Sequence, residues 1–318
     1  MSMAASRRES RRKAETTYSR FCVWEKGAIP LAVTYNNLYL DVRKQLRERG
    51  VDAATLEARE LVCFGTGKDR EELTRDGGLY ASPELERQVW ELVERRLAGE
   101  PVAYLIGEWE FYGLPLDVST DVLIPRTDTE VLAAEAGAYV KALGECRVLD
   151  LCAGSGCVGL AVAAQAPKAR VALGEYSESA LKICRQNIRR CGLSGRVVPI
   201  RTDARQKPDR TLGEFQCIVC NPPYIPTGDI PGLDVSVRDY EPHLALDGGA
   251  DGLDFYRSVS SLWQEALAPG GRLYFEVGIG QADSVLRLMR TQGFGDIQVV
   301  KDTGDIPRVV FGTLLTEV

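Results

Sequence analysis

From Arg126 onward the chain alternates between short apolar segments of strand type and segments with helical spacing. The strand-like segments are 146–151, 170–176, 215–220 and 271–278, and helical segments follow at 157–166, 177–192, 252–267 and from Gln281. A third strand ends before Asp203, and further strands are expected near Ile297 and Val309. Strands joined through helices run parallel. The pattern predicts an α/β fold with a doubly wound, mostly parallel seven-stranded sheet and helices on both faces.

The first 125 residues have a different organisation. Apolar residues recur at helical spacing from about Tyr35 to Glu100, with Gly50, Gly65 and Gly99 as helix stops, which predicts a small helical domain over 31–100. The segment 101–125 alternates around Gly113 and predicts a β-hairpin linker, so the sheet domain covers 126–318. Residues 1–30 have no apolar pattern and are expected to form a basic, disordered tail.

Charge and hydropathy restrict the partners. The chain carries a net charge of −6, and the tail is basic with seven Lys/Arg against three Asp/Glu, so residues 31–318 carry −10. Such a body is a poor match for a long phosphate backbone, and we expect no direct nucleic-acid partner. With no long apolar run and no secretory signal, we expect no membrane partner. The scattered cysteines do not form a disulfide framework, so we expect a reducing, cytoplasmic location.

The metal-ligating side chains do not form a metal-binding pattern. The nine cysteines are scattered, and the pair Cys217 and Cys220 lies in a strand-like segment. Side chains three positions apart on a strand point to opposite faces, so this pair is not expected to bind zinc. The single histidine, His243, excludes a multi-histidine site and is interpreted as structural. We therefore predict no metal.

A glycine-bearing turn follows the first strand of the sheet domain, in VLDLCAGSGCVG at 148–159. Gly154 and Gly156 allow the backbone to approach a ligand closely, and the next helix presents free N–H groups. A lone glycine-rich turn with Gly154, Gly156 and Gly159 is only a weak signal for a dinucleotide. Asp150, just before the turn, suits the amino-acid portion of a ligand.

Two further acids follow neighbouring strands. Glu175 ends the second strand, 25 residues after Asp150, where a carboxylate can accept hydrogen bonds from both hydroxyls of a ribose. Its alternative interpretation is a solvated charge at a strand end. Asp203 follows the third strand and can accept from an adenine amino group. The position of these acids predicts a nucleoside-containing ligand.

The fourth strand runs into CIVCNPPYIP at 217–226, where consecutive prolines end the strand. The Asn221 side-chain oxygen and the Pro222 carbonyl can accept both N–H groups of a planar amide or exocyclic amine, while Tyr224 packs against the flat group. Because such a nitrogen is a weak nucleophile, orienting it toward an electrophile is the expected catalytic device. A plain Pro-Pro turn is the alternative.

These segments resemble S-adenosylmethionine-dependent methyltransferases, in which Asn-Pro-Pro-Tyr marks a planar NH₂ acceptor. The match extends over PVAYLIGEWEFYGLPLDVSTDVLIPRTDTE from Pro101, VRDYEPHLALDGGADGLDFYR from Val237 and GDIPRVVFG from Gly304. Together they resemble the HemK or PrmC family, which methylates the glutamine amide of peptide chain release factors. The resemblance covers about residues 35–314.

The resemblance implies a Rossmann-like class I methyltransferase domain and a helical domain that recognises the release factor, whose glutamine lies in a Gly-Gly-Gln loop. The methyl donor is then S-adenosyl-L-methionine. Its implied contacts are Asp150, Cys152, Ala153, Gly154, Ser155 and Gly156 around the methionine part, Glu175 at the ribose, Asp203 and Ala204 at the adenine, and Asn221. Asn221, Pro222, Pro223 and Tyr224 would hold the glutamine, and Phe111 would line its pocket.

Three positions depart from the family pattern. Cys152 replaces the first glycine of the turn, Glu175 replaces the usual Asp, and Ala204 stands where relatives often carry an aromatic residue. Cys152 requires a backbone conformation that a Cβ tolerates, or a shifted loop. The longer Glu175 changes the reach of the carboxylate, and Ala204 removes a stacking surface.

Two other functions compete with this interpretation. The same tetrapeptide orients the exocyclic amine of adenine or guanine in nucleic acid, but a nucleic-acid methyltransferase normally carries a basic groove, and the acidic body offers none clearly. A protein that only binds the cofactor or a release factor would not need Asn221. The sequence favours a methyltransferase acting on protein glutamine.

Overall fold

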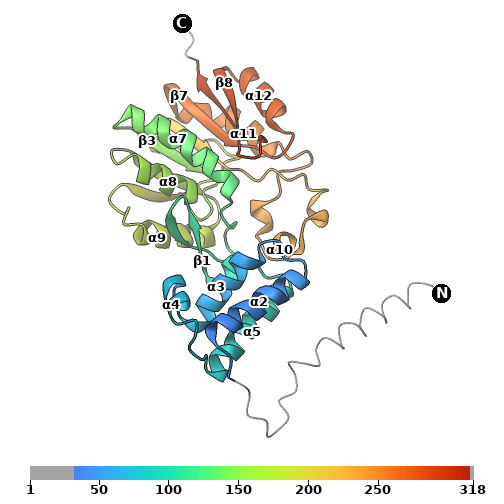
Figure 1. Cartoon of the computed structure of the whole chain (residues 1–318). Coiled ribbons are helices and arrows are strands. Elements are labelled where there is room, and N and C mark those ends of the chain that lie inside the picture. Colours follow the sequence, from blue (N-terminus) through green and yellow to red (C-terminus); the bar gives the residue numbers. More distant parts are fainter. Residues whose placement is uncertain (1–31, 316–318) are drawn as a thin grey trace, which may run out of the picture. The chain divides into compact units, whose positions relative to one another are not determined.

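The structure is a computed structural model that describes residues 32–315 (Figure 1). The predicted basic tail at 1–30 lies outside the described residues. The described chain forms two compact units that meet in sequence between Val93 and Glu94. The first is helical, and the second contains all the named strands of the described part.

The helices of the first unit follow the expected apolar spacing. They are α2 (Tyr35–Glu48), α3 (Ala54–Thr66), α4 (Arg70–Arg75) and α5 (Pro83–Leu97), the last of which continues past Val93. Thr34 caps α2 by accepting a hydrogen bond from the Asn37 N–H at 3.3 Å. Gly65, predicted as a helix stop, lies within α3, and the helix instead ends at the left-handed Gly67, with φ of 67°.

The second unit begins with the short helix α6 (Val102–Ile106) and the predicted hairpin. Strands β1 (Glu108–Phe111) and β2 (Leu114–Asp117) pair antiparallel, with Phe111 opposite Leu114. The two turn residues, Tyr112 and Gly113, both have positive φ, which matches the twist of a two-residue hairpin turn. The expectation of a hairpin around Gly113 is confirmed.

The seven-stranded sheet confirms the predicted fold class. Its order is β5-β4-β3-β6-β7-β9-β8, and all pairs are parallel except those made by β9. The strands are β3 (Arg147–Leu151), β4 (Arg170–Glu175), β5 (Val197–Arg201), β6 (Phe215–Cys220), β7 (Leu267–Glu276), β8 (Phe294–Lys301) and β9 (Pro307–Leu314). The order reverses beside β3, which places the carboxyl ends of β3 and β6 at a topological switch point.

Helices cover both faces of the sheet, and alternate strand residues enter two separate cores. One core joins the sheet to α7 (Glu130–Leu143), α8 (Cys157–Gln165) and α9 (Glu178–Arg190), and the other joins it to α11 (Asp254–Leu262) and α12 (Ala282–Thr291). Cys217 belongs to the first core and Cys220 to the second, so the expected opposite orientation of this pair is confirmed.

Short helical turns occupy the remaining connections of the second unit. They are η2 (Thr127–Thr129), η3 (Arg210–Leu212), η4 (Ile230–Gly232), α10 (Val235–Arg238), η5 (His243–Ala245) and η6 (Trp263–Ala266). Within residues 32–315, no helix is long and apolar enough to cross a membrane. In the same residues, no group of three or more His, Cys, Asp or Glu side chains is placed to hold a metal ion.

Candidate active site

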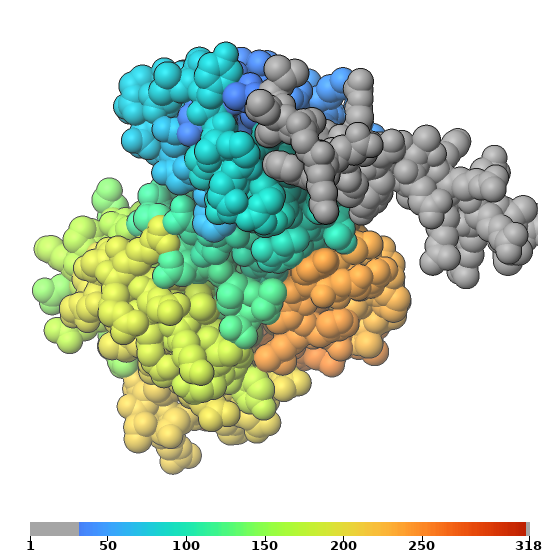
Figure 2. Space-filling view, turned by 90° about the horizontal axis from the view of Figure 1, so that it is seen from below, coloured from blue at the N-terminus to red at the C-terminus, as the bar shows by residue number. Residues whose placement is uncertain are grey.

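A cavity of about 280 Å³ lies at the carboxyl ends of β3, β4, β5 and β6. Residues after each of these strands line it, and the segments 120–129 and 242–245 supply further walls. Figure 2 shows the surface of the segment that follows β2 in green. It lies between the surface around α9, in yellow-green, and the surface of the segment that precedes α11, in orange. The cavity therefore coincides with the switch point at which α/β sheets bind ligands.

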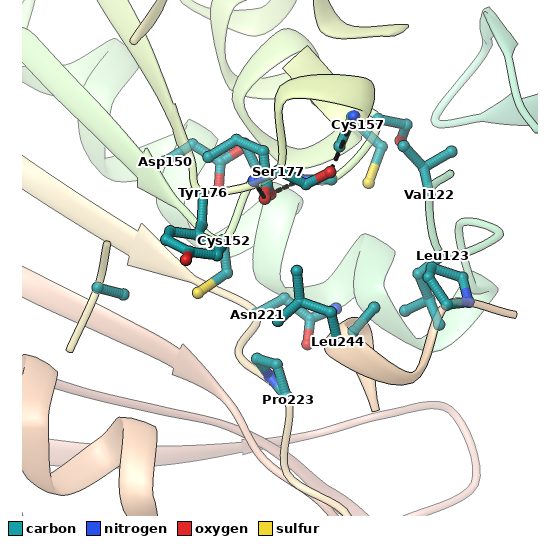
Figure 3. A pocket seen from close by; sticks show the side chains of 18 of the residues that line it. Val122, Leu123, Asp150, Cys152, Cys157, Tyr176, Ser177, Asn221, Pro223 and Leu244 are labelled. Atoms are coloured by element: carbon teal, nitrogen blue, oxygen red, sulfur yellow. Dashed lines mark hydrogen bonds between the residues drawn. The ribbon is translucent and has the colours of Figure 1, made fainter. Parts of the chain in front are cut away.

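The turn between β3 and α8 has left-handed backbone at three positions. Cys152, Gly154 and Gly156 have φ of 58°, 56° and 83°. A non-glycine residue rarely adopts this conformation, so Cys152 holds an uncommon left-handed backbone at the position where the family has glycine. Figure 3 shows the Cys152 side chain beside Asn221 at the cavity, with Val122 and Leu123 across from them.

Asp150 fixes the start of α8. Its side chain is 1% exposed, and its Oδ2 accepts a hydrogen bond from the Gly159 N–H at 2.8 Å. Burial raises the pKa of Asp150 to about 7, and the charge of Glu175 acts in the same direction. A Cβ on Gly159 would lie 2.9 Å from that Oδ2, so the glycine permits the close approach of helix to strand.

Glu175 reaches back to the glycine turn. Its Oε2 accepts from the Gly154 N–H at 2.9 Å, and its Oε1 accepts from the Ser177 N–H at 2.8 Å. A carboxylate has about four acceptor sites, so both oxygens retain capacity for a further donor. The additional methylene of Glu175 thus ties the second strand end to the turn, and the carboxylate lines the cavity.

The turn also contains a polar atom without a partner. The Ser155 side chain is 2% exposed, lines the cavity, and its Oγ makes no hydrogen bond within the described residues. A buried hydroxyl without a partner is unfavourable by about 1–3 kcal/mol. The combination of this free hydroxyl, the open backbone at Gly154 and the buried Asp150 carboxyl fits a ligand with an amino-acid group at this position.

The far wall of the cavity provides an apolar surface next to one acid. Asp203 lines the cavity, and its Oδ1 accepts hydrogen bonds from the backbone N–H and Nε of Arg205 at 2.9 and 3.3 Å. Ala204 is buried and leaves the surface to Phe255 and Leu244, which also line the cavity. Phe255 thus supplies an aromatic side chain to this part of the cavity, where residue 204 has none.

Asn221 and the residues that follow it lie at the other end of the cavity. The Asn221 Nδ2 donates to the Thr129 Oγ1 at 3.4 Å, which ties β6 to η2. The Tyr224 carbonyl accepts from Gln281 Nε2 at 2.9 Å, and a Cβ on Gly248 would lie 2.7 Å from the Tyr224 Cα. This packing makes the turn rigid, and burial raises the pKa of Tyr224 to about 12.

The structure brings most of the sequence-predicted residues to one cavity but not all of them. The lining includes Asp150, Cys152, Ala153, Gly154, Ser155, Glu175, Asp203, Ala204, Asn221 and Pro223. Gly156, Pro222 and Tyr224 adjoin the lining residues in sequence but do not line the cavity themselves. Phe111 is 1% exposed within the core beneath α7, α8 and α9, and His243 is exposed; neither lines the cavity.

Sequence reasoning missed the wall formed by residues 120–129. Arg126 forms an ion pair with Glu241, whose side chain is 1% exposed and also accepts from the Ile124 N–H at 3.2 Å. These contacts hold two loops together where both line the cavity. Most residues of this wall lie in segments without helical or strand periodicity, so no local pattern marked them as cavity residues.

Comparisons with known proteins agree with this geometry. A family model described as the PrmC N-terminal domain matches residues 37–107, and one described as the methyltransferase small domain matches residues 116–230. The chain is 42% identical over 274 residues to the release factor glutamine methyltransferase of Geobacter sulfurreducens, covering 86% of this chain and 94% of that protein. It is 35% identical to the protein of the same name from Caulobacter vibrioides, covering 89% and 97%.

A solved structure shares the fold. The catalytic domain of hMettl16, solved in complex with MAT2A 3′UTR hairpin 6, superimposes with a TM-score of 0.52 at 15% sequence identity. The match covers 72% of this chain and 84% of that chain. At this identity the similarity concerns the methyltransferase fold alone.

Proposed function

Because the chain belongs to the family of release factor glutamine methyltransferases, we propose that it methylates the side-chain amide nitrogen of the glutamine in the Gly-Gly-Gln loop of peptide chain release factors. The observation that carries the proposal is the position of Asn221. It lies at the end of β6, beside the glycine turn after β3, and lines the same cavity as that turn.

S-adenosyl-L-methionine, when bound, supplies a methyl group on a positively charged sulfur. The residues that would hold its amino-acid part are Asp150, Cys152, Ala153, Gly154, Ser155 and Gly156, with Asn221 adjacent. Glu175 would accept from the ribose hydroxyls, and Asp203 and Ala204 would contact the adenine. The unpartnered Ser155 hydroxyl and the apolar surface of Phe255 and Leu244 support this assignment.

Asn221, Pro222 and Tyr224 act on the acceptor. The Asn221 Oδ1 and the Pro222 carbonyl accept the two N–H bonds of the glutamine amide, and Pro223 and Tyr224 pack against its flat face. As the amide nitrogen forms its bond to the methyl group, the bond from that group to sulfur would break and a neutral thioether would leave. The nitrogen would then release its proton to solvent, so the residues need only orient the nitrogen. Phe111, on the hairpin, is proposed to support this pocket from the core.

The partner assignment follows the domain organisation. We propose that the helical domain at 31–100 recognises the release factor, that the hairpin linker at 101–125 connects it to the methyltransferase domain at 126–318, and that the reaction occurs in the cytoplasm. Methylation of a nucleic-acid amine is not favoured, because the relatives carry the glutamine methyltransferase name and residues 31–318 carry a charge of −10.

A labelled-methyl assay tests the proposal. Purified enzyme, labelled S-adenosylmethionine and a release factor should yield one labelled protein, and changing the glutamine of its Gly-Gly-Gln loop should remove the label. Asn221→Ala should lower turnover by at least about 10²-fold, because one preorganised hydrogen-bonding group is lost. Cofactor affinity, measured by calorimetry, should change far less.

Two controls accompany this assay: one distinguishes a protein acceptor from a nucleic-acid acceptor, and the other tests whether Asn221 orients the acceptor or binds the cofactor. Label in a cell extract should survive nuclease and disappear with protease. The reverse pattern would favour a nucleic-acid amine. A parallel loss of cofactor binding and turnover in Asn221→Ala would move Asn221 from acceptor orientation to cofactor binding.

A further inference from the structure

Glu276 is a buried acid next to the proposed acceptor site that no motif pointed to. It ends β7, and because Phe275 pairs with Cys220, Glu276 lies level with Asn221 on the neighbouring strand. The residue is 2% exposed. Its Oε2 has no hydrogen-bond partner among the described residues. Burying a carboxyl oxygen without a hydrogen-bond partner costs free energy. The position of Glu276 beside the proposed acceptor site therefore suggests a function for its carboxyl.

The Glu276 carboxyl lies beside the side chains of Thr129 and Asn221, and both side chains favour its charged form. The Asn221 Nδ2 donates to the Thr129 Oγ1 at 3.4 Å. Thr129 is 1% exposed, so water does not compete for these contacts. Among the described residues, the polar side chains beside the Asn221 amide include Thr129 on η2 and Glu276 at the end of β7.

The ionisation state of a carboxyl decides which end of a neighbouring amide it accepts. A carboxylate only accepts hydrogen bonds, so the NH₂ end of Asn221 must face it, and the Oδ1 end is left for the cavity. A protonated carboxyl carries an O–H that can donate to Oδ1, which permits the reversed amide. In the reversed state the Asn221 NH₂ would face the acceptor NH₂, and two donors cannot bond.

We propose that Glu276 is a positioning residue: as a carboxylate it holds the NH₂ end of Asn221 and so presents Oδ1 to the glutamine amide that receives the methyl group. The inference rests on the proposed acceptor role of Asn221. Glu276 does not line the cavity, and it acts on the substrate only through Asn221.

The surroundings of Glu276 place its titration near neutral pH. Burial raises its pKa to about 7, while the side chains of Thr129 and Asn221 and the charge of Arg308 act in the opposite direction. The charge of Asp128 raises it further. Arg308 is itself paired with Asp128 and Asp302, each at 3.0 Å. The other ionisable groups that interact electrostatically with Glu276 are Tyr224, Tyr256 and Cys157.

The first test is the pH dependence of kcat from pH 5.5 to 8.5, at saturating release factor and cofactor. Because the carboxylate is the active form, kcat should rise with pH through an inflection near 7 in the wild type. Glu276→Gln can donate to Oδ1 at every pH, so it should lose this inflection and lower kcat by about 10- to 100-fold. The cofactor dissociation constant should change less than about threefold, which also shows that the variant is folded.

Asp128→Asn provides the matched variant, since the Asp128 side chain is 54% exposed and the substitution leaves the carboxyl of Glu276 intact. Removing its negative charge lowers the pKa of Glu276, so the kcat inflection should move to lower pH. Asp150 also has a pKa of about 7, but Asp128 is not among the groups that shift it. If the inflection in the pH dependence of kcat moves to lower pH in Asp128→Asn, the group that titrates is therefore Glu276 and not Asp150.

Each outcome decides between supporting and rejecting the inference. A Glu276→Gln enzyme with wild-type kcat and an unchanged inflection would overturn it, as would an inflection that does not move in Asp128→Asn. A wild-type enzyme that does not label the release factor would instead reject the proposed function. If Glu276→Gln fails to fold, the Asp128→Asn variant tests the inference by itself: an inflection of kcat at lower pH supports it, and an unmoved inflection rejects it.

Discussion

At the scale of single residues, the departures from the family pattern have visible structural consequences. Cys152 takes φ of 58°, a left-handed conformation that is uncommon for a residue with a Cβ. Glu175 uses its greater length to accept from the N–H groups of Gly154 and Ser177. Glu175 therefore fixes the turn through the Gly154 N–H, and Asp150 fixes the helix that follows through the Gly159 N–H. Glu175 also lines the cavity.

The role of Glu175 can be tested with a substitution of equal shape. Glu175→Gln replaces one acceptor oxygen with an NH₂ group, which cannot accept from a backbone N–H or a ribose hydroxyl. We expect the cofactor dissociation constant to rise by about 10- to 100-fold, as for the loss of one or two charge-assisted hydrogen bonds, with turnover at saturating cofactor nearly unchanged. Calorimetry and initial rates measure the two effects.

Glu178→Gln is the matched control, because Glu178 is exposed at the start of α9 and pairs only with Arg185 among the described ion pairs. Its cofactor affinity should equal that of the wild type. The structure already excludes the solvated strand-end charge, because Glu175 is 8% exposed. Equal affinity in Glu175→Gln as well would mean that Glu175 only ties the strand end to Gly154 and Ser177 and does not bind the cofactor.

At the scale of elements, the site depends on the distance between α8 and the strands beneath it. Gly159 lies in α8 where a Cβ would meet Leu173 Cδ2 at 2.3 Å and the Asp150 Cβ at 3.0 Å. Leu173 is fully buried in the core, so it has little room to move. This glycine is required by the close packing of α8 on the strands beneath it.

Gly159→Ala should therefore lower the free energy of unfolding by about 1–3 kcal/mol, the usual range for overpacking a core. It should also weaken cofactor binding, because Asp150 accepts its hydrogen bond from this residue. Urea denaturation and calorimetry measure both. Gly195→Ala is the control: no atom lies within 4 Å of its added Cβ, so its stability should stay within about 0.5 kcal/mol. Equal stability of the two variants would contradict this account of α8.

At the scale of the whole molecule, two buried acids lie at the same edge of the sheet. Asp150 is the residue before the last of β3 and Glu276 ends β7, and burial raises the pKa of each to about 7. The ordinary values are 3.8 and 4.5, so the folded protein binds protons that the unfolded chain releases. This contribution to stability is fully present below about pH 4 and is lost as the pH rises through 7.

We expect the free energy of unfolding to fall between pH 5 and 8, by on the order of 2 kcal/mol for each of these acids. Urea denaturation at several pH values measures the slope. Asp150→Asn and Glu276→Gln should each flatten it, because neither side chain can then release a proton. Asp251→Asn should leave it unchanged, since the pKa of the exposed Asp251 is lowered to about 2 by Arg257. A slope of the opposite sign would show that the buried acids are ionised in the folded protein throughout.

The sequence alone determined the elements and the positions of the main polar groups. Apolar periodicity is local, so the alternation of strands and helices was sufficient to predict the parallel sheet, and the hairpin followed from alternation around Gly113. Glycines and strand-terminal acids such as Glu175 were also recognisable, because backbone geometry constrains which residues fit those positions.

Only the tertiary structure decided which side chains meet. The ion pair between Arg126 and Glu241 joins residues 115 positions apart, and no local pattern marks either of them. Glu276 contacts Asn221 because β7 pairs with β6, a register that is set by packing on both faces of the sheet. The charge state of such a group depends on its burial, which is a property of the folded chain and not of the sequence around it.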